Sequence, residues 1–359
     1  MFVAWRDLRF AKGRFALMGA VILLITLLVG LLSGLTAGLG RENVSAITSL
    51  PADHLAFAAP GGGQDVSFTN SRIEQHVWQQ WGEVPGVRSA EPLGIAMTRA
   101  QVGSASFSLS AFGVRPGSPL APHADALTGG TVVLSGPAAA ELDVLPGDSI
   151  RVGGDVMTVA AVGGDAMYSH TPVAWVSLSD WQQLGATAGD GMGATVVALS
   201  TVSGSGLPAA DETLSTTTVS VGDALQAIGS YTAENGSLQL MRGFLFAISA
   251  LVIGAFFTVW TIQRSGDVAV LKALGAATGY LLRDALAQAV LVLVVGTGIG
   301  TALAAGIGVA IGDSVPFVLD AATVLLPMTV LIILGALGAA ISIRRITSVD
   351  PLTALGSAR

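Results

Sequence analysis

Four long apolar runs, the first separated from the second by about 200 mostly polar residues, constrain the fold of this chain most strongly. At about 1.5 Å of rise per residue, roughly 20 helical residues cross a hydrocarbon core of about 30 Å, so each run is long enough to span a membrane. The sequence therefore predicts a polytopic membrane protein with four transmembrane helices in a one-plus-three arrangement. The predicted helices cover residues 15–40, 243–263, 285–312 and 321–343.

Composition agrees with a membrane protein that carries one folded domain outside the bilayer. Apolar residues make up 52% of the 359 residues and charged residues only 11%. The chain has no cysteine, which excludes disulfides, thiolate metal sites and a cysteine nucleophile. The first apolar run is longer than the roughly 7–15 residues of a signal-peptide core and lacks a small-x-small cleavage site, so we expect a retained helix.

The distribution of charge predicts the orientation. The short segments 1–14, 264–284 and 344–359 hold ten basic and four acidic residues, a net charge of +6. The long segment 41–242 holds seven basic and 18 acidic residues, a net charge of −11. Because basic residues concentrate on the cytoplasmic side, both termini and the 264–284 loop are predicted to be cytoplasmic. The large domain and the short 313–320 loop are then outside, and the acidity of the domain argues against nucleic acid as a partner.

The segment 41–242 reads as a mixed α/β extracytoplasmic domain. Alternating apolar residues predict strands, and a helical pattern at 136–145 lies between the first two of them. From about 221 to 242 the pattern is helical again and continues into the second apolar run, which predicts a stalk. The predicted strands cover 131–134, 149–152, 156–162 and 173–178.

Small residues recur on one face of the first predicted membrane helix. Gly30, Gly34 and Gly38 follow at intervals of four residues. Such a stripe lets helix backbones approach closely, either within one subunit or between two subunits. Glycine is also common in membrane helices of a Gly-rich protein, so the spacing alone leaves both packing interpretations open.

The most specific motif lies in the cytoplasmic loop between the second and third apolar runs. We expect a short helix there, with apolar residues along one side and two charged residues left in water. Such a helix suits insertion into an apolar groove of a partner, or a position in the lipid headgroup layer. The motif residues are Asp267, Val268, Leu271, Lys272, Leu274 and Gly275.

This motif resembles the coupling helix of ABC transporter permeases named after the FtsX and MacB proteins, also called the type VII family, with Asp267 in place of the usual Glu. Residues 344–355 resemble the closing motif of the family, residues 4–9 its opening motif, and residues 132–148 part of its small extracytoplasmic lobe. The resemblance covers the whole chain in the expected order.

The resemblance implies a permease subunit that forms a homodimer and binds two copies of a separate ABC ATPase subunit. Movement of the ATPases would then pass through the coupling helices to the outer domains. The residues themselves agree, because the only two lysines, Lys12 and Lys272, stand outside any Gly-x-x-x-x-Gly-Lys-(Ser/Thr) loop. ATP is therefore expected on the partner subunit, and the chain itself is not expected to be an enzyme.

Catalytic motifs are missing from the sequence. No Gly-x-Ser-x-Gly and no His-Glu-x-x-His occurs. The four histidines, His54, His76, His123 and His170, are scattered along the outer domain. We therefore predict neither a catalytic site nor a metal site.

The layout of four spans and an outer domain of about 200 residues is most similar to that of the haem-exporting members of the family, which makes haem the predicted substrate. Tyrosinate, carboxylate and imidazole can bind haem iron, and arginine pairs with propionates. Tyrosine and arginine are also common anchors at membrane interfaces. The candidate haem-binding residues are Tyr231, Glu234, Tyr168, Arg41 and Arg242.

Two other functions remain open at this stage. A permease of this layout also suits the export or release of a lipid, a lipoprotein or an antibiotic. It also suits a signalling or scaffolding role, in which ATP-driven movement activates an extracytoplasmic partner. The direction of transport follows from the family resemblance alone.

Overall fold

The computed structural model describes residues 12–186, 193–202, 206–263, 265–312 and 315–347. The chain divides into two compact units, one formed by Met1–Gly38 and Ser237–Arg359 and the other by Leu39–Gly236. We call them the membrane unit and the outer unit. Most of the predicted cytoplasmic segment 1–14 and of the predicted tail 344–359 lies outside the described residues.

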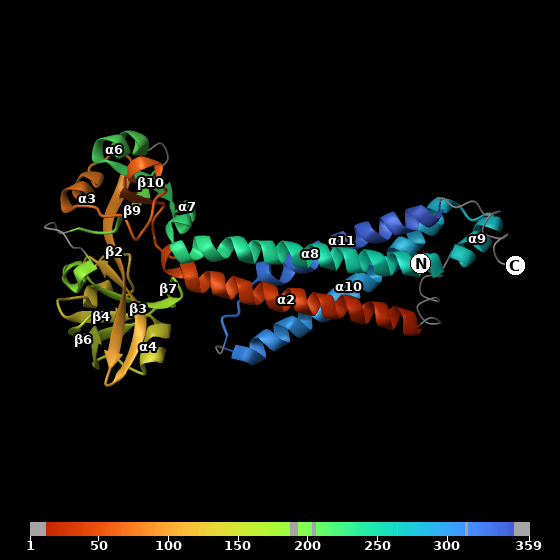
Figure 1. Cartoon of the computed structure of the whole chain (residues 1–359), viewed down its shortest axis with the longest axis horizontal. Coiled ribbons are helices and arrows are strands. Elements are labelled where there is room, and N and C mark those ends of the chain that lie inside the picture. Colours follow the sequence, from red (N-terminus) through yellow and green to blue (C-terminus); the bar gives the residue numbers. More distant parts are fainter. Residues whose placement is uncertain (1–11, 187–192, 203–205, 264, 313–314, 348–359) are drawn as a thin grey trace. The chain divides into compact units, whose positions relative to one another are not determined.

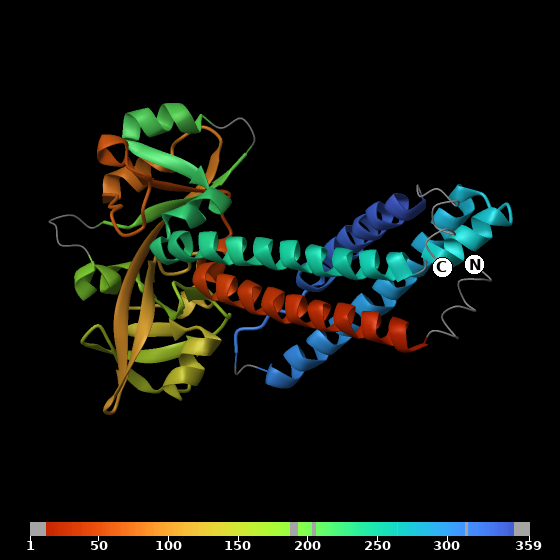
Figure 2. The ribbon, with the colours of Figure 1, turned by 45° about the vertical axis from the view of Figure 1, so that its right-hand side comes forward.

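The membrane unit contains four helices that are long and apolar enough to cross a bilayer, as predicted. Three of them follow one another closely, with the short helix α9 (Ser265–Ala273) between the first two of the three. The long helices are α2 (Lys12–Thr48), α8 (Gly229–Gln263), α10 (Thr278–Ile311) and α11 (Ala321–Thr347). In this unit α2 and α8 run alongside each other, and α10 crosses them obliquely (Figure 1 and Figure 2).

The glycine stripe of α2 packs against other parts of the same chain. A Cβ atom built on Gly30 would lie 2.8 Å from Cβ of Ala304 on α10. Cβ atoms on Gly34 and Gly38 would overlap the Phe317 ring and the Pro316 carbonyl. The stripe therefore accommodates α10 and the segment before α11, which identifies it as an intrachain packing surface.

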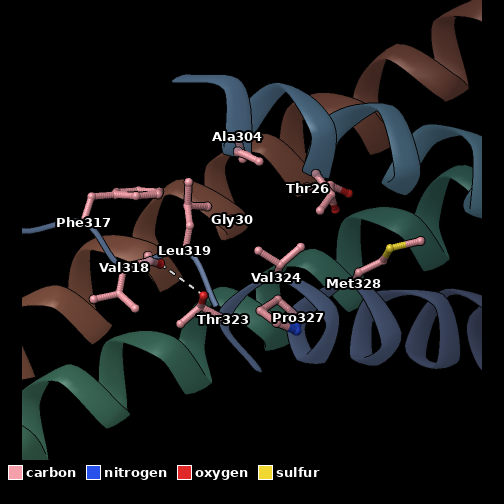
Figure 3. Close-up of a pocket in the computed structure, with 13 residues that line it drawn as sticks. Thr26, Gly30, Ala304, Phe317, Val318, Leu319, Thr323, Val324, Pro327 and Met328 are labelled. Carbon is pink, nitrogen blue, oxygen red and sulfur yellow. Dashed lines mark hydrogen bonds between the residues drawn. The ribbon is translucent and has the colours of Figure 1, made fainter. Parts of the chain in front are cut away.

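The segment before α11 lies on the α2 glycine stripe as a strap. The Val318 N–H donates to the Gly34 carbonyl at 3.1 Å, and the Phe317 ring lies against Gly34; Phe317 and Val318 are labelled in Figure 3. Thr26, Thr323 and Pro327 help to line a cavity of about 10 Å³ next to this strap (Figure 3). That volume suits roughly one water molecule, so the cavity is too small for a transported substrate.

The outer unit is built on a ten-stranded sheet in the order β10-β1-β9-β2-β3-β8-β4-β6-β5, with β7 paired to β8. An additional pairing of β2 with β5 closes the strands from β2 to β5 into a barrel. The long strands β2 and β3, orange in Figure 2, belong to this barrel, and β2 also pairs with β9 in the open part of the sheet. The strands are β1 (His54–Ala58), β2 (Val87–Val102), β3 (Ala105–Val114), β4 (Thr131–Leu134), β5 (Ser149–Val152), β6 (Asp155–Val162), β7 (Met167–Tyr168), β8 (Thr171–Ser177), β9 (Val196–Thr201) and β10 (Thr216–Ser220).

Short helices accompany the sheet, and its core is apolar and aromatic. Trp81 and Trp181 are fully buried in one cluster of the core, and Phe57 and Phe112 are buried in a second cluster. The helices are α3 (Gln75–Trp81), α4 (Gly136–Leu142), α5 (Leu178–Trp181), α6 (Leu207–Leu214) and α7 (Val221–Ala224).

The predicted strand–helix–strand unit is present. Strands β4 and β5 have the predicted limits, and α4 lies between them. The helix begins at Ser135, whose Oγ accepts from the Ala138 N–H at 3.3 Å, as an N-cap does. It ends earlier than predicted, because Asp143 adopts a left-handed conformation with φ of 52° at its C-cap.

The predicted continuous helix over 221–242 is wrong in its first part. Helix α7 ends at Ala224, a short 3-10 turn covers Leu225–Ala227, and Ile228 is extended with ψ of 111°. The side chain of Ile228 is buried in the core of the outer unit, and the chain turns there to place it. Helix α8 begins only at Gly229 and then continues without interruption to Gln263.

Candidate functional site

Two predicted ligand residues lie at the start of α8, in the outer unit. Tyr231 and Glu234 are three residues apart, so they are neighbours on the helix surface. Tyr231 is half-buried and packs against the core of the outer unit. The side chain of Glu234 is 46% exposed. The pair therefore presents a phenol and a carboxylate at one edge of the outer unit.

His170 connects Glu234 to the end of α2. Its Nε2 lies 2.8 Å from Glu234 Oε2, and its Nδ1 lies 3.7 Å from Glu42 Oε2. An ionised carboxylate only accepts hydrogen bonds, so the His170 tautomer that fits this contact has its N–H at Nε2 and donates to Glu234 Oε2. The imidazole thus lies between two carboxylates from two different helices.

Asn43 completes this polar junction. Its Nδ2 lies 3.1 Å from His170 Nε2 and donates to Glu234 Oε2 at 3.4 Å, and its Oδ1 accepts from the Ser230 hydroxyl at 2.7 Å. The Ser230 and Ser169 hydroxyls are 2.7 Å apart. Asn43 is buried, and these bonds satisfy its amide group. Side chains from α2, α8 and the turn before β8 therefore form one hydrogen-bonded network.

The turn that carries His170 has an uncommon backbone conformation. Ser169 and His170 both have positive φ, 51° and 61°, between the paired strands β7 and β8. Two successive left-handed residues are typical of a two-residue type I′ hairpin turn. Their backbone N–H groups donate to the carbonyls of Asn43 and Glu42, at 3.0 and 3.3 Å. Helix α2 thus stabilises the conformation that points the imidazole toward α8.

Tyr168 lies in a different environment. Its side chain is only 6% exposed and packs edge-to-face on Phe68 and Phe112. Burial raises the pKa of the Tyr168 phenol, which keeps the hydroxyl neutral. The structure therefore places this candidate ligand in the hydrophobic core, apart from the exposed carboxylate of Glu234.

The two candidate arginines lie on α2 and α8. Arg41 is exposed on α2, in the outer unit, and Arg242 lies two turns beyond Glu234 along α8, in the membrane unit. Neither guanidinium forms an ion pair with a described residue. The buried Nε atom of Arg242 has no hydrogen-bond partner in the described part of the chain. Both cations therefore remain available to an anionic group.

The short helix predicted between the second and third apolar runs is present as α9. Leu271 and Leu274 are 39% and 80% exposed, whereas Val268 and Lys272 are half-buried. Asp267 belongs to α9, but its side chain lies outside what the structure describes. Leu271 on α9 and Leu274 in the turn after it are thus exposed.

Gly275 ends this helix in a Schellman motif. It has φ of +91°, its N–H donates to the Lys272 carbonyl, and the Ala276 N–H donates to the Leu271 carbonyl, both at 3.0 Å. These two bonds satisfy carbonyl groups at the end of α9 and turn the chain toward α10.

Sequence reasoning missed the junction around His170. The three titratable members, Glu42, His170 and Glu234, are far apart in the chain, and no spacing motif joins them. Within the described ranges, no group of three or more histidine, aspartate or glutamate side chains has an arrangement that could hold a metal ion.

Comparison with protein families assigns both parts of the chain. The MacB-like periplasmic core domain matches residues 15–217, which is more than half of the chain. The FtsX-like permease C-terminal domain matches residues 240–351. The two matches follow each other in chain order. The first covers most of α2 and most of the outer unit, and the second covers α8 from residue 240 on, α10 and α11.

Curated relatives match the chain over its full length. A protein of Staphylococcus epidermidis with the provisional name hemin transport system permease protein HrtB is 26% identical over 364 residues, covering 99% of both chains. Its counterpart in Staphylococcus haemolyticus is 25% identical over 370 residues, again covering 99% of both. An uncharacterized ABC transporter permease of Mycobacterium tuberculosis is 24% identical over 364 residues, with the same coverage.

Among solved structures, the periplasmic region of MacB from Actinobacillus actinomycetemcomitans covers 53% of this chain and 97% of its own length, with 13% identity and a TM-score of 0.36. The extracellular domain of the transporter YknZ from Gram-positive bacteria covers 45% of this chain and 88% of its own, with 14% identity and a TM-score of 0.32. We draw no functional conclusion from similarities at this level.

Proposed function

This chain belongs to the family of ABC transporter permeases with a MacB-like periplasmic core domain and an FtsX-like C-terminal region, and we propose that it is the membrane subunit of a haem exporter. The observation that carries this proposal is its full-length similarity to relatives named as hemin transport permeases. In a plasma membrane, the four helices would cross the bilayer with both termini inside and the outer unit outside, as the charge distribution indicates.

The residues at the start of α8 are chemically suited to haem. Tyr231 and Glu234 supply two kinds of oxygen ligand for iron. The Glu234 carboxylate accepts hydrogen bonds through Oε2, and no described residue bonds to its Oε1. Arg41, exposed and unpaired on α2, suits a propionate, as does Arg242 further along α8. The buried Tyr168 is the candidate whose position favours direct contact least.

We propose that two copies of this chain bind two copies of a separate ABC ATPase. The contact would be made by Leu271 of α9 and Leu274 in the turn after it, which are exposed and suit an apolar groove of the ATPase. Movement of α9, driven by ATP on the partner subunit, would then drive export. Haem enters this scheme as the transported substrate, and ATP is bound by the partner subunit.

The test is a haem titration of the purified permease with its cognate ATPase, read as the absorption spectrum and as haem-dependent ATP hydrolysis. We expect a saturable Soret shift at about one haem for two chains, which is the ratio for a single site shared by the two subunits of the proposed dimer. The double variant Tyr231→Phe with Glu234→Ala should lose that shift. The matched control, Tyr280→Phe with Glu83→Ala, removes the same groups at other positions and should keep it.

An unchanged spectrum in the double variant would contradict the proposed ligands while leaving haem as the substrate. No Soret shift and no change in ATP hydrolysis with the wild-type complex would contradict haem export. The family assignment would stand in that case, and the substrate would be sought among lipids, lipoproteins, antibiotics and extracytoplasmic protein partners.

A further inference from the structure

We infer that His170 is a positioning residue, which holds the Glu234 carboxylate in the orientation needed to bind haem iron. This inference rests on the proposed function and assigns a role to a residue that belongs to the outer domain. The basis is the junction between the β7–β8 turn, the end of α2 and the start of α8. All of its members lie within the outer unit.

The two oxygens of Glu234 are not equivalent. Oε2 accepts from His170 Nε2 at 2.8 Å and from Asn43 Nδ2 at 3.4 Å. No described residue donates to Oε1, and the side chain is 46% exposed. A carboxylate held through one oxygen offers the other in a fixed direction. Ligating carboxylates of metal sites are commonly oriented by such a hydrogen bond from a neighbouring residue.

His170 is itself held in place from two sides. Its backbone N–H donates to the Glu42 carbonyl at 3.3 Å, and its Nδ1 faces the Glu42 carboxylate at 3.7 Å. The side chain is 28% exposed, so solvent does not surround the ring. Because the backbone and both ring nitrogens have partners, the imidazole cannot rotate without losing contacts. The orientation of the Glu234 side chain therefore depends on the β7–β8 turn and the end of α2 as well as on α8.

Asn43 also donates to Glu234, but its hydrogen bond is too weak to substitute for that of His170. Its amide is already bonded to Ser230, and its bond to Glu234 is the longer of the two. Removal of the imidazole would leave Glu234 with one weak donor and a rotatable side chain. The expected consequence is a loss of haem affinity of roughly 10-fold to 100-fold, as for other residues that orient metal ligands.

Two substitutions at the same position separate this role from general packing. His170→Gln keeps an N–H donor close to the place of Nε2, whereas His170→Leu removes it with a side chain of similar size. Both replacements place a long side chain on a residue with positive φ, so the conformational strain of the backbone is similar in the two variants. We expect His170→Leu to weaken haem binding and to shift the Soret band. His170→Gln should keep most of the wild-type haem affinity and a Soret band close to the wild-type position.

His123→Leu is the matched control, because His123 also has a left-handed backbone, with φ of 51°, and makes no contact with Glu234. It should leave the haem spectrum unchanged. If His170→Leu lowers the unfolding temperature of the haem-free protein more than His123→Leu does, His170→Asn takes its place. Asparagine tolerates positive φ, and its amide is too short to reach Glu234.

A double-mutant cycle completes the test. If His170 acts through Glu234, then His170→Leu has no further effect on haem affinity in a Glu234→Gln background. The inference is overturned if Glu234→Gln weakens binding while His170→Leu binds haem as the wild type does. It is also overturned if the two losses are simply additive. Absence of haem binding by the wild type would remove the proposed function, and this inference with it.

Discussion

His170 Nε2 donates to Glu234 Oε2 over 2.8 Å, across 64 residues of sequence. The bond joins the β7–β8 turn to the first turns of α8, and Glu42 of α2 faces the other ring nitrogen. Helices α2 and α8 are the two helices that the unit boundary divides, so each contributes residues to both units. The junction therefore fixes the outer-unit ends of these two helices to each other.

The substitution Leu271→Asp should separate ATP hydrolysis from transport. Leu271 is partly exposed on α9, where a partner groove would bury it, and a buried unpaired charge costs several kcal/mol. We expect binding of the ATPase to weaken at least about 10-fold, which corresponds to about 1.4 kcal/mol. Co-purification with the ATPase measures binding, and ATP hydrolysis and haem efflux from proteoliposomes, measured together, show whether the two are separated.

Met97→Asp is the control for Leu271→Asp, because it also places an acid at an exposed apolar position, on β2 of the outer unit. It should leave ATPase binding unchanged. Wild-type assembly and transport in the Leu271→Asp variant would count against α9 as the coupling element.

The substitution Gly38→Ala should destabilise the membrane unit. An added Cβ overlaps the backbone carbonyl of Pro316, which cannot move away as a flexible side chain does. Overpacking of this kind costs about 1–3 kcal/mol. Gly19→Ala on the same helix meets no atom within 4 Å and should be neutral or slightly stabilising. Thermal unfolding in detergent distinguishes the two, and equal unfolding temperatures would contradict the packing role of the stripe.

The sequence predicts the architecture well because its signals are local and long. Apolar runs of 20 residues or more specify membrane helices whatever their tertiary contacts. Strand β4 and strand β5 are likewise read correctly from alternation alone. The glycine stripe is also visible in the sequence, but its partner is not. Only the structure shows that Pro316 and Phe317 occupy it.

The candidate site is predicted less completely, because it depends on contacts between distant segments. Tyr231 and Glu234 are recognised as neighbours from their helical spacing. No local sequence pattern predicts that His170 contacts Glu234. None predicts that the side chain of Tyr168, two residues earlier, is buried in the core. The helix start at Gly229 was also missed, since burial of Ile228 interrupts a pattern that is helical in the sequence.

The substitution Gly275→Ala should loosen the end of the coupling helix. Its φ of +91° suits glycine, and a residue with a Cβ atom loses roughly 1–2 kcal/mol there. We expect faster amide hydrogen exchange over residues 265–276 and weaker stimulation of the ATPase. Gly266→Ala, within α9 and free of neighbours within 4 Å, is the control and should slow exchange, if it changes it at all. Identical exchange in the two variants would exclude a capping role for Gly275.

The substitution Tyr168→Phe should change stability only at high pH. Burial raises the pKa of the Tyr168 phenol above the value of about 10 found in unfolded chains. A raised pKa means that the neutral form is favoured in the fold, so its contribution is complete below about pH 10 and is lost as pH rises through the folded value. With Tyr168 present, the free energy of unfolding should fall by up to about 1.4 kcal/mol per pH unit above pH 10. Denaturant unfolding of the full chain in detergent at pH 8, 9.5 and 11 should therefore show a shallower alkaline loss for Tyr168→Phe than for the control Tyr280→Phe, whose ring is exposed. Parallel curves for the two variants would mean that the Tyr168 phenol ionises without opening the core.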